Sequence, residues 1–181
     1  MAVIPVLLVL YLWELYKKNK FKKISQKIYA GFVFFVWLIF VPNAAYIITD
    51  IRHISGYCPI DSYLKVCPQN AWMIMFFYFY SLVGWLINVY LLLKMELLIA
   101  KIYNKKTARM FAYLLIPLVS LGVMLGLVDR WNSWEIFVYP VAILKSIWRY
   151  FTSWIYFRNW LVFSLGLYAS YFIAKKFIKK I

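Results

Sequence analysis

Charged side chains are scarce in this sequence, and the residue types that most often carry catalysis or bind metals are scarcer still. Only 15% of the 181 residues are charged, and the chain holds six acidic residues, one histidine and two cysteines, while 66% of its residues are hydrophobic. A soluble domain is about half apolar and a quarter charged, so this composition excludes a water-soluble globular protein. With so few histidine and cysteine ligands, and no glycine-rich phosphate-binding loop, the sequence predicts no bound metal and no cofactor.

Long apolar runs are what the sequence has in abundance. Several approach or exceed the roughly 18 to 20 residues that a helix needs to cross about 30 Å of hydrocarbon, and they lack the alternation of a membrane β-strand. We therefore predict an all-α fold, a polytopic transmembrane helical bundle with five or six membrane-crossing helices, as a single transmembrane domain over residues 1–181. The expected crossings cover residues 2–16, 28–48, 71–93, 110–128 and 154–174, and segment 134–148 is either re-entrant, interfacial or a sixth crossing.

The basic residues form clusters beside the apolar runs and give the chain a net charge of +15. Such clusters are typical of cytoplasmic loops that face anionic lipid, and no basic groove or nucleic-acid-binding motif accompanies them. We predict a multi-pass protein of the cell membrane with cytoplasmic lysine-rich loops, membrane lipids as partners and no nucleic acid. Five and six crossings place almost the same number of basic residues inside, and both put residues 50–70 and 129–133 outside.

A polar stripe is predicted at the outer end of the second run, formed by Asn43, Tyr46, Asp50 and His53. On an ideal α-helix these four side chains share an arc of about 80°, whereas Arg52 points elsewhere. Polar groups at membrane depth usually face a bundle interior or a cavity. The stripe is either a functional site or simply the solvated end of a helix at the membrane interface. Within it, His53 and Asp50 are the candidate catalytic pair, a general base with its orienting acid.

A second polar segment, "DRWNSWE", follows the fourth run. Asn132 or Ser133 suits the N-cap of a following helix and Glu135 suits its first turn. Arg130 has the geometry to clamp a phosphate or carboxylate, or to pair with Asp50 across the bundle. The predicted binding residues are Asn43, Tyr46, Asp50, His53, Arg130, Asn132, Ser133 and Glu135.

Two cysteines, Cys58 and Cys67, are each followed by a proline and are separated by eight residues in the loop predicted to be external. They form either a disulfide that closes this loop or two free thiols.

Two smaller features concern helix packing. Gly122 and Gly126 form a G-x-x-x-G pattern that favours close packing of helices within the chain. Glu96, beside Lys94, is predicted to form a solvated boundary pair.

The two polar segments resemble the hallmark segments of a bacterial integral membrane protein family known as domain of unknown function 1361. The matching positions are Pro42, Asn43, Ala44, Tyr46, Thr49, Asp50 and His53, then Gly126, Arg130, Asn132, Ser133, Trp134 and Pro140. The opening "AVIPVLL" is similar to an early stretch of the family, so the resemblance covers nearly the whole chain. It implies a multi-pass fold in a bacterial plasma membrane, the absence here of a helix that usually precedes the opening stretch, and no assigned activity.

The sequence departs from the family pattern at two positions. Leu127 stands where the family tends to have arginine, and Glu135 replaces aspartate. If that arginine carries a shared activity, this member has lost or altered it.

Three functions are compatible with these residues. The first is a binding or transport-related protein whose outward-facing polar site takes a lipid headgroup or a small polar or anionic solute, with Arg130 holding an anion. The second is a membrane-embedded enzyme, a hydrolase or transferase with His53 as base. The third is a structural scaffold in which an Asp50–Arg130 ion pair is purely architectural. The sequence does not predict an oligomeric state.

Overall fold

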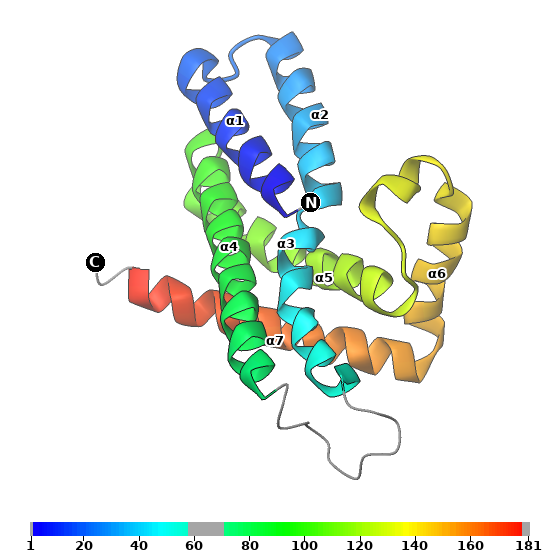
Figure 1. Ribbon diagram of the computed structural model, residues 1–181. Helices are drawn as coiled ribbons and strands as arrows, with labels where there is room; N and C mark the ends of the chain where they lie inside the picture. The colour runs from blue at the N-terminus through cyan, green and yellow to red at the C-terminus, as the bar shows by residue number, and fades with distance from the viewer. Residues whose placement is uncertain (1, 58–70, 179–181) are drawn as a thin grey trace.

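The computed structural model describes residues 2–57 and 71–178 (Figure 1). These residues form helices joined by short turns, with no strand among them, so the predicted all-α class is confirmed for this part of the chain. The label η marks a 3-10 helix. The elements are α1 (Val3–Asn19), α2 (Ile24–Phe40), α3 (Pro42–Tyr46), η1 (Ile47–Tyr57), α4 (Trp72–Ile102), α5 (Lys105–Val128), η3 (Ser133–Phe137), α6 (Pro140–Thr152) and α7 (Trp154–Ile178).

Three stretches in the described part of the chain are long and apolar enough to cross a membrane, Ile24–His53, Trp72–Ile102 and Lys105–Val128. The α4 helix exposes large apolar side chains at helical spacing, among them Phe76, Val83 and Leu86. Water would penalise such a surface, whereas lipid tails would not. The sequence predicts five or six crossings, more than these three stretches, and that number stays a prediction.

The second apolar run is not the continuous α-helix that we predicted. The α2 helix ends at Phe40, and Pro42 begins the separate helix α3. Proline lacks the N–H that a helix interior needs but suits the first helical position, where that group would be unpaired anyway. From Ile47 onward the chain tightens into the 3-10 helix η1, and this change alters which side chains lie together.

Segment 134–148 also differs from a single helical run. It contains most of η3, a break after Phe137, and the first part of α6. Pro140 is the first residue of α6, which explains why the helix begins there.

The core lies where α1, α2, α3, α4, α5 and α7 meet, and Trp37, Leu91 and Ile116 are fully buried in it. The turn between α1 and α2 lies at the same end of the molecule as the C-terminal end of α4, and η1 lies at the other end (Figure 1). The α7 helix packs against α5 and crosses α4 (Figure 1).

Glycines let α3 pack closely against α5. A Cβ atom on Gly122 would lie 2.4 Å from Cγ of Pro42, and one on Gly126 would lie 3.3 Å from the Tyr46 ring. The first distance is far below van der Waals contact, so only glycine fits at this crossing. The predicted packing role of the G-x-x-x-G pattern within the chain is therefore confirmed.

The prediction for Glu96 was wrong about its partner. Its carboxylate accepts hydrogen bonds from Lys175 and from the Tyr171 hydroxyl on α7. The Glu96 side chain is only 13% exposed, so this pair joins two helices rather than marking a solvated boundary. The sequence alone favoured Lys94, which is closer to Glu96 along the chain. Lys94 lies on another face of α4, so it is not the partner.

Candidate functional site

A polar cavity of about 360 Å³ lies where α3 meets the C-terminal end of α5 and the turn before η3. It brings together five of the predicted binding residues from segments about 90 positions apart. Its lining comprises Pro42, Asn43, Tyr46, Gly122, Gly126, Arg130, Trp131, Asn132 and Ser133. The other three predicted residues, Asp50, His53 and Glu135, are not part of this lining.

The Asn43 side chain joins the two walls of the cavity. Its Oδ1 accepts a hydrogen bond of 3.2 Å from the Ser133 hydroxyl. Its Nδ2 is buried and has no hydrogen-bond partner in the described part of the chain. A buried donor without a partner costs about 1 to 3 kcal/mol, and the terminal amide torsion is soft. This unpaired donor belongs to a side chain that lines the cavity.

Unpaired buried polar atoms also occur on Trp37, Ser81 and Asn88. None of these three residues lines the polar cavity. The Asn43 amide differs from them because its residue lines the cavity.

Arg130 stands at the exposed rim of the cavity in an unusual backbone conformation. Its φ of 62° lies in the left-handed region, which costs a non-glycine residue free energy and is often found at functional sites. The conformation turns the chain so that the Trp131 N–H donates to the Leu125 carbonyl over 3.2 Å. Among the described residues, no ion pair or hydrogen bond involves the Arg130 guanidinium. In particular, the Asp50–Arg130 pair considered from the sequence is absent there.

Asn132 and Glu135 form a capping box at the start of η3. The Glu135 carboxylate accepts hydrogen bonds from the Asn132 backbone and, over 3.1 Å, from its side-chain amide. This arrangement confirms the predicted cap. It uses Glu135 to hold the loop that carries Arg130 and Ser133.

The 3-10 geometry of η1 divides the predicted stripe. Side chains three residues apart eclipse one another in a 3-10 helix, so Thr49 and Arg52 follow Tyr46 on one row. Accordingly, Thr49 donates to the Tyr46 carbonyl over 2.7 Å, and Arg52 donates to the Tyr46 hydroxyl over 3.0 Å. The prediction that Arg52 points elsewhere was wrong, because it assumed an α-helix. Asp50 and His53 lie together on another row, 3.9 Å apart.

The Asp50–His53 pair is weakly arranged for catalysis. A separation of 3.9 Å between Oδ1 and Nε2 exceeds a hydrogen bond, and the His53 side chain is half exposed. Within residues 2–57 and 71–178, no group of three His, Cys, Asp or Glu side chains could hold a metal. Cys58 and Cys67 lie outside the described residues.

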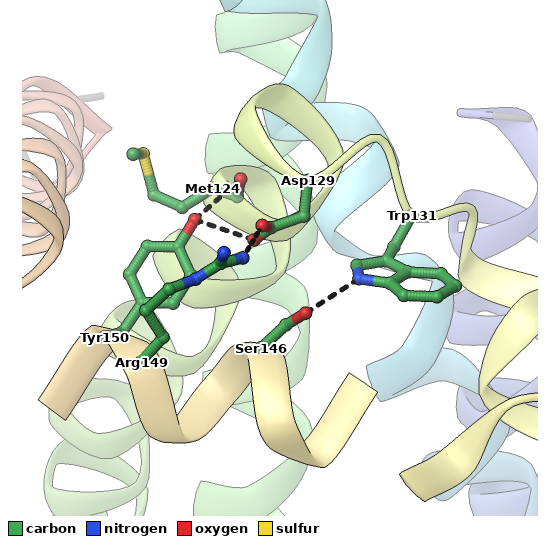
Figure 2. Close-up of polar contacts among 6 residues, drawn as sticks. All are labelled: Met124, Asp129, Trp131, Ser146, Arg149 and Tyr150. Carbon is green, nitrogen blue, oxygen red and sulfur yellow. Dashed lines mark hydrogen bonds and ion pairs between the residues drawn. The ribbon is translucent and has the colours of Figure 1, made fainter. Parts of the chain in front are cut away.

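A hydrogen-bond network that was not predicted from the sequence holds Asp129, the residue before Arg130 (Figure 2). The Asp129 carboxylate, 8% exposed, pairs with Arg149 and lies 3.2 Å from the Tyr150 hydroxyl. That hydroxyl also lies 3.1 Å from the Met124 carbonyl. Burial, and then the neighbouring Asp129 charge, raise the pKa of Tyr150, so it stays a neutral donor. Both carboxylate oxygens of Asp129 therefore have partners.

The same loop has a second contact with α6. The indole Nε1 of Trp131 donates to the Ser146 hydroxyl over 3.0 Å, and Figure 2 shows the two side chains pointing toward each other. One feature of the sequence could have indicated the Asp129–Arg149 pair. Arg149 lies in a short amphipathic segment, and a charge near lipid needs a partner.

An apolar groove of about 220 Å³ adjoins the polar cavity between α2, α5, η3 and α6. Its apolar residues include Leu38, Leu118 and Ile147. The groove and the cavity share five lining residues, Pro42, Gly122, Trp131, Asn132 and Ser133. A polar space thus continues into an apolar one.

Comparison with protein families gives a match over nearly the whole chain. The model of a family described as "Protein of unknown function (DUF1361)" matches residues 1–173, nearly the whole chain, and confirms the resemblance. Comparison with curated proteins found no match, and comparison with solved structures found none either.

Proposed function

The chain belongs to the DUF1361 family, and on that premise we propose that it is an integral membrane protein whose outward-facing polar cavity binds the anionic headgroup of a membrane lipid. The observation that carries this proposal is the pairing of unused hydrogen-bond donors with an adjoining apolar groove. Such donors in the described cavity include the Arg130 guanidinium and the Asn43 Nδ2.

The free hydrogen-bonding capacity of the cavity favours an anion. The Asn43 carbonyl oxygen already accepts from Ser133, and the Tyr46 hydroxyl accepts from Arg52. What is left unused is a planar cation, an amide N–H and the Tyr46 hydroxyl proton, which all suit phosphate or carboxylate oxygens. A cationic or donor-rich ligand would leave these donors unpaired.

The groove favours a lipid headgroup over a free solute. A ligand with its charged end near Arg130 can place an apolar chain over Pro42 and Gly122, toward Leu38 and Leu118. Such a chain stays in apolar surroundings while the headgroup is bound, because the groove replaces neighbouring lipid tails. A small solute would gain nothing from this surface.

The proposed topology is a multi-pass arrangement in a bacterial-type cell membrane, with the lysine-rich loops in the cytoplasm. In it, α1 and α7 cross the bilayer together with the three apolar stretches, and η3 with α6 lies at the outer surface. The 13 residues of α6 span only about 20 Å, and Val141, Leu144 and Trp148 face outward from it.

Reporter fusions test this topology. The C-terminal end is the decisive position, because the two topologies place it on opposite sides of the membrane. A reporter there is cytoplasmic with five crossings and external with six.

The alternative functions have less support. The Asp50–His53 pair lies outside the cavity lining, and no Asp50–Arg130 ion pair occurs in the described part of the chain. We therefore place neither a catalytic base nor a purely architectural ion pair at this site.

Lipid binding by the purified full chain tests the proposal. We would titrate dioctanoyl phosphatidylglycerol into detergent micelles of the wild type, Arg130→Gln, and the matched control Arg158→Gln, whose arginine lies on α7 away from the cavity, and count bound lipid by native mass spectrometry. We expect at least a ten-fold weaker affinity for Arg130→Gln alone. Equal affinities would contradict the proposal, and equally tight binding of inorganic phosphate would identify a free anion instead of a headgroup.

A further inference from the structure

A second and larger cavity, of about 550 Å³, lies near the opposite ends of α2 and α5 from the polar cavity. It is enclosed by α1, α2, α4 and α5. On α2 it contacts Ala30 and Phe34, whereas the polar cavity begins only at Pro42. On α5 it contacts Phe111, and the polar cavity contacts Gly122 and later residues. The two cavities therefore share no residue.

The interior of this cavity is apolar. Its walls include Phe34 and Phe111, whose ring centroids lie 5.8 Å apart, together with the buried side chains of Met95 and Leu98. Gly31 also lines it, and a Cβ atom there would meet nothing within 4 Å. A space of this size falls in the range of small-molecule sites, about 300 to 1,000 Å³, and its lining suits an aliphatic chain.

Three lysines from three different segments surround the cavity. Lys20 follows α1, Lys27 lies in the first turns of α2, and Lys101 lies in the last turn of α4. The Lys101 ammonium lies 5.0 Å from the Trp13 ring, and none of the three pairs with a carboxylate among the described residues. The lining therefore carries positive charge that no described carboxylate compensates.

The turn that carries Lys20 is held in a costly conformation. Lys20 and Phe21 have φ values of 48° and 49°, and two successive left-handed non-glycine residues cost about 1 to 3 kcal/mol each. The conformation buries Phe21 against Tyr16, with ring centroids 5.6 Å apart. The Tyr16 hydroxyl in turn donates to the Lys101 carbonyl over 3.0 Å. Two of the three lysines are thus fixed relative to each other.

We propose that this cavity is a binding site for an anionic phospholipid of the lysine-rich leaflet, with an acyl chain against Phe34 and Leu98 and the phosphate among Lys20, Lys27 and Lys101. A zwitterionic lipid carries its own cation beside the phosphate and gains less from these lysines. Each lysine near a membrane surface contributes about a five-fold change in affinity for anionic lipid. The site is independent of the lipid headgroup proposed for the polar cavity.

Lipid retention by the full chain tests this site. All variants carry Arg130→Gln, so that lipid in the polar cavity does not contribute. Protein in micelles is given equal amounts of phosphatidylglycerol and phosphatidylcholine, and the bound lipids are counted by native mass spectrometry. We expect a preference of at least ten-fold for phosphatidylglycerol, and its loss when Lys20, Lys27 and Lys101 are all replaced by glutamine.

Two matched controls separate this site from general charge and from misfolding. Replacing Lys18, Lys22 and Lys106 by glutamine removes the same charge from residues outside the cavity lining, so the preference should persist. Gly31→Leu fills the cavity and should lower retention about ten-fold, whereas Gly166→Leu, also in open space, should not.

Three results would overturn the proposal. The two lysine triples could lower retention equally, which would indicate unspecific attraction to a basic surface. Gly31→Leu could leave retention unchanged, which would mean that no chain enters the cavity. Inorganic phosphate could displace the lipid at equal concentration, which would identify a soluble anion as the ligand.

Discussion

Asp129 and Arg130 are neighbours in the sequence, yet their charged groups are in opposite situations. The Asp129 carboxylate is 8% exposed and paired with Arg149 and Tyr150 (Figure 2). The Arg130 guanidinium is exposed at the rim of a cavity, with no partner in the described part of the chain. One group has its partners supplied by the fold, and the other is available to a ligand.

The contrast extends to the rest of the molecule. Glu96, Tyr171 and Lys175 form a second closed set at the opposite end of the bundle. In an apolar surrounding a closed set joins helices, because separating its members would leave a charge unpaired. The Arg130 guanidinium joins no other described element, and Asn43, which accepts from Ser133, keeps its Nδ2 donor unused. The predictions below therefore separate loss of stability from loss of binding.

The largest expected effect is on the closed network. Arg149→Gln leaves the Asp129 carboxylate largely buried without its cation, and we expect the free energy of unfolding to fall by about 3 kcal/mol. The measurement is unfolding in mixed micelles of increasing SDS content. Lys145→Gln on the same helix is the control and should change little. If Arg149→Gln were as stable as this control, the closed network would not be architectural.

A somewhat smaller effect is expected where the two walls of the open site meet. Gly122→Ala places a methyl group 2.4 Å from Pro42, and overpacking of this kind costs about 2 kcal/mol. The same SDS titration measures it. Gly31→Ala, in open space, should be neutral or stabilising. Equal stability of both alanine variants would show that α3 and α5 do not approach this closely.

Removing one hydroxyl from the closed network should have a moderate effect. Tyr150→Phe removes the contacts to Asp129 and the Met124 carbonyl, and we expect a loss of about 1 kcal/mol in the free energy of unfolding. Tyr156→Phe, on the neighbouring ring, is the control. A loss as large as that of Arg149→Gln would assign the main role to the hydroxyl and not to the ion pair.

The smallest effect on stability is expected in the open site. Arg130→Gln should change the free energy of unfolding by less than about 0.5 kcal/mol, and Asn43→Ala, which also loses the hydrogen bond from Ser133, by at most about 1 kcal/mol, while both lower affinity for dioctanoyl phosphatidylglycerol. Comparing SDS titrations with lipid titrations checks both parts. A large loss of stability without a loss of binding would place these residues with the closed networks.

The predicted helical class followed directly from the apolar runs, because length and hydropathy are properties of a segment by itself. The meeting of Asn43 with Ser133 was also anticipated from the two polar segments. The division of the stripe was not, because the change from α-helix to 3-10 helix after Tyr46 alters the row on which Arg52 and Asp50 lie. Helix type at such a point depends on tertiary packing.

The closed networks could not be predicted for a related reason. The partners of Glu96 and Asp129 lie on helices whose relative rotation no single sequence reveals. Lys94 is nearer to Glu96 along the chain and was its expected partner, and no partner was predicted for Asp129. Separation in sequence was a poor guide, because each helix turns its neighbouring residues to different faces.

The most direct measurement is an experimental structure of the full chain in nanodiscs that contain phosphatidylglycerol. The account predicts headgroup density in the polar cavity, with a phosphate oxygen about 3 Å from the Arg130 guanidinium and from the Asn43 Nδ2, and chain density in the adjoining groove. A cavity without lipid, with Arg130 paired to Asp50, would contradict it.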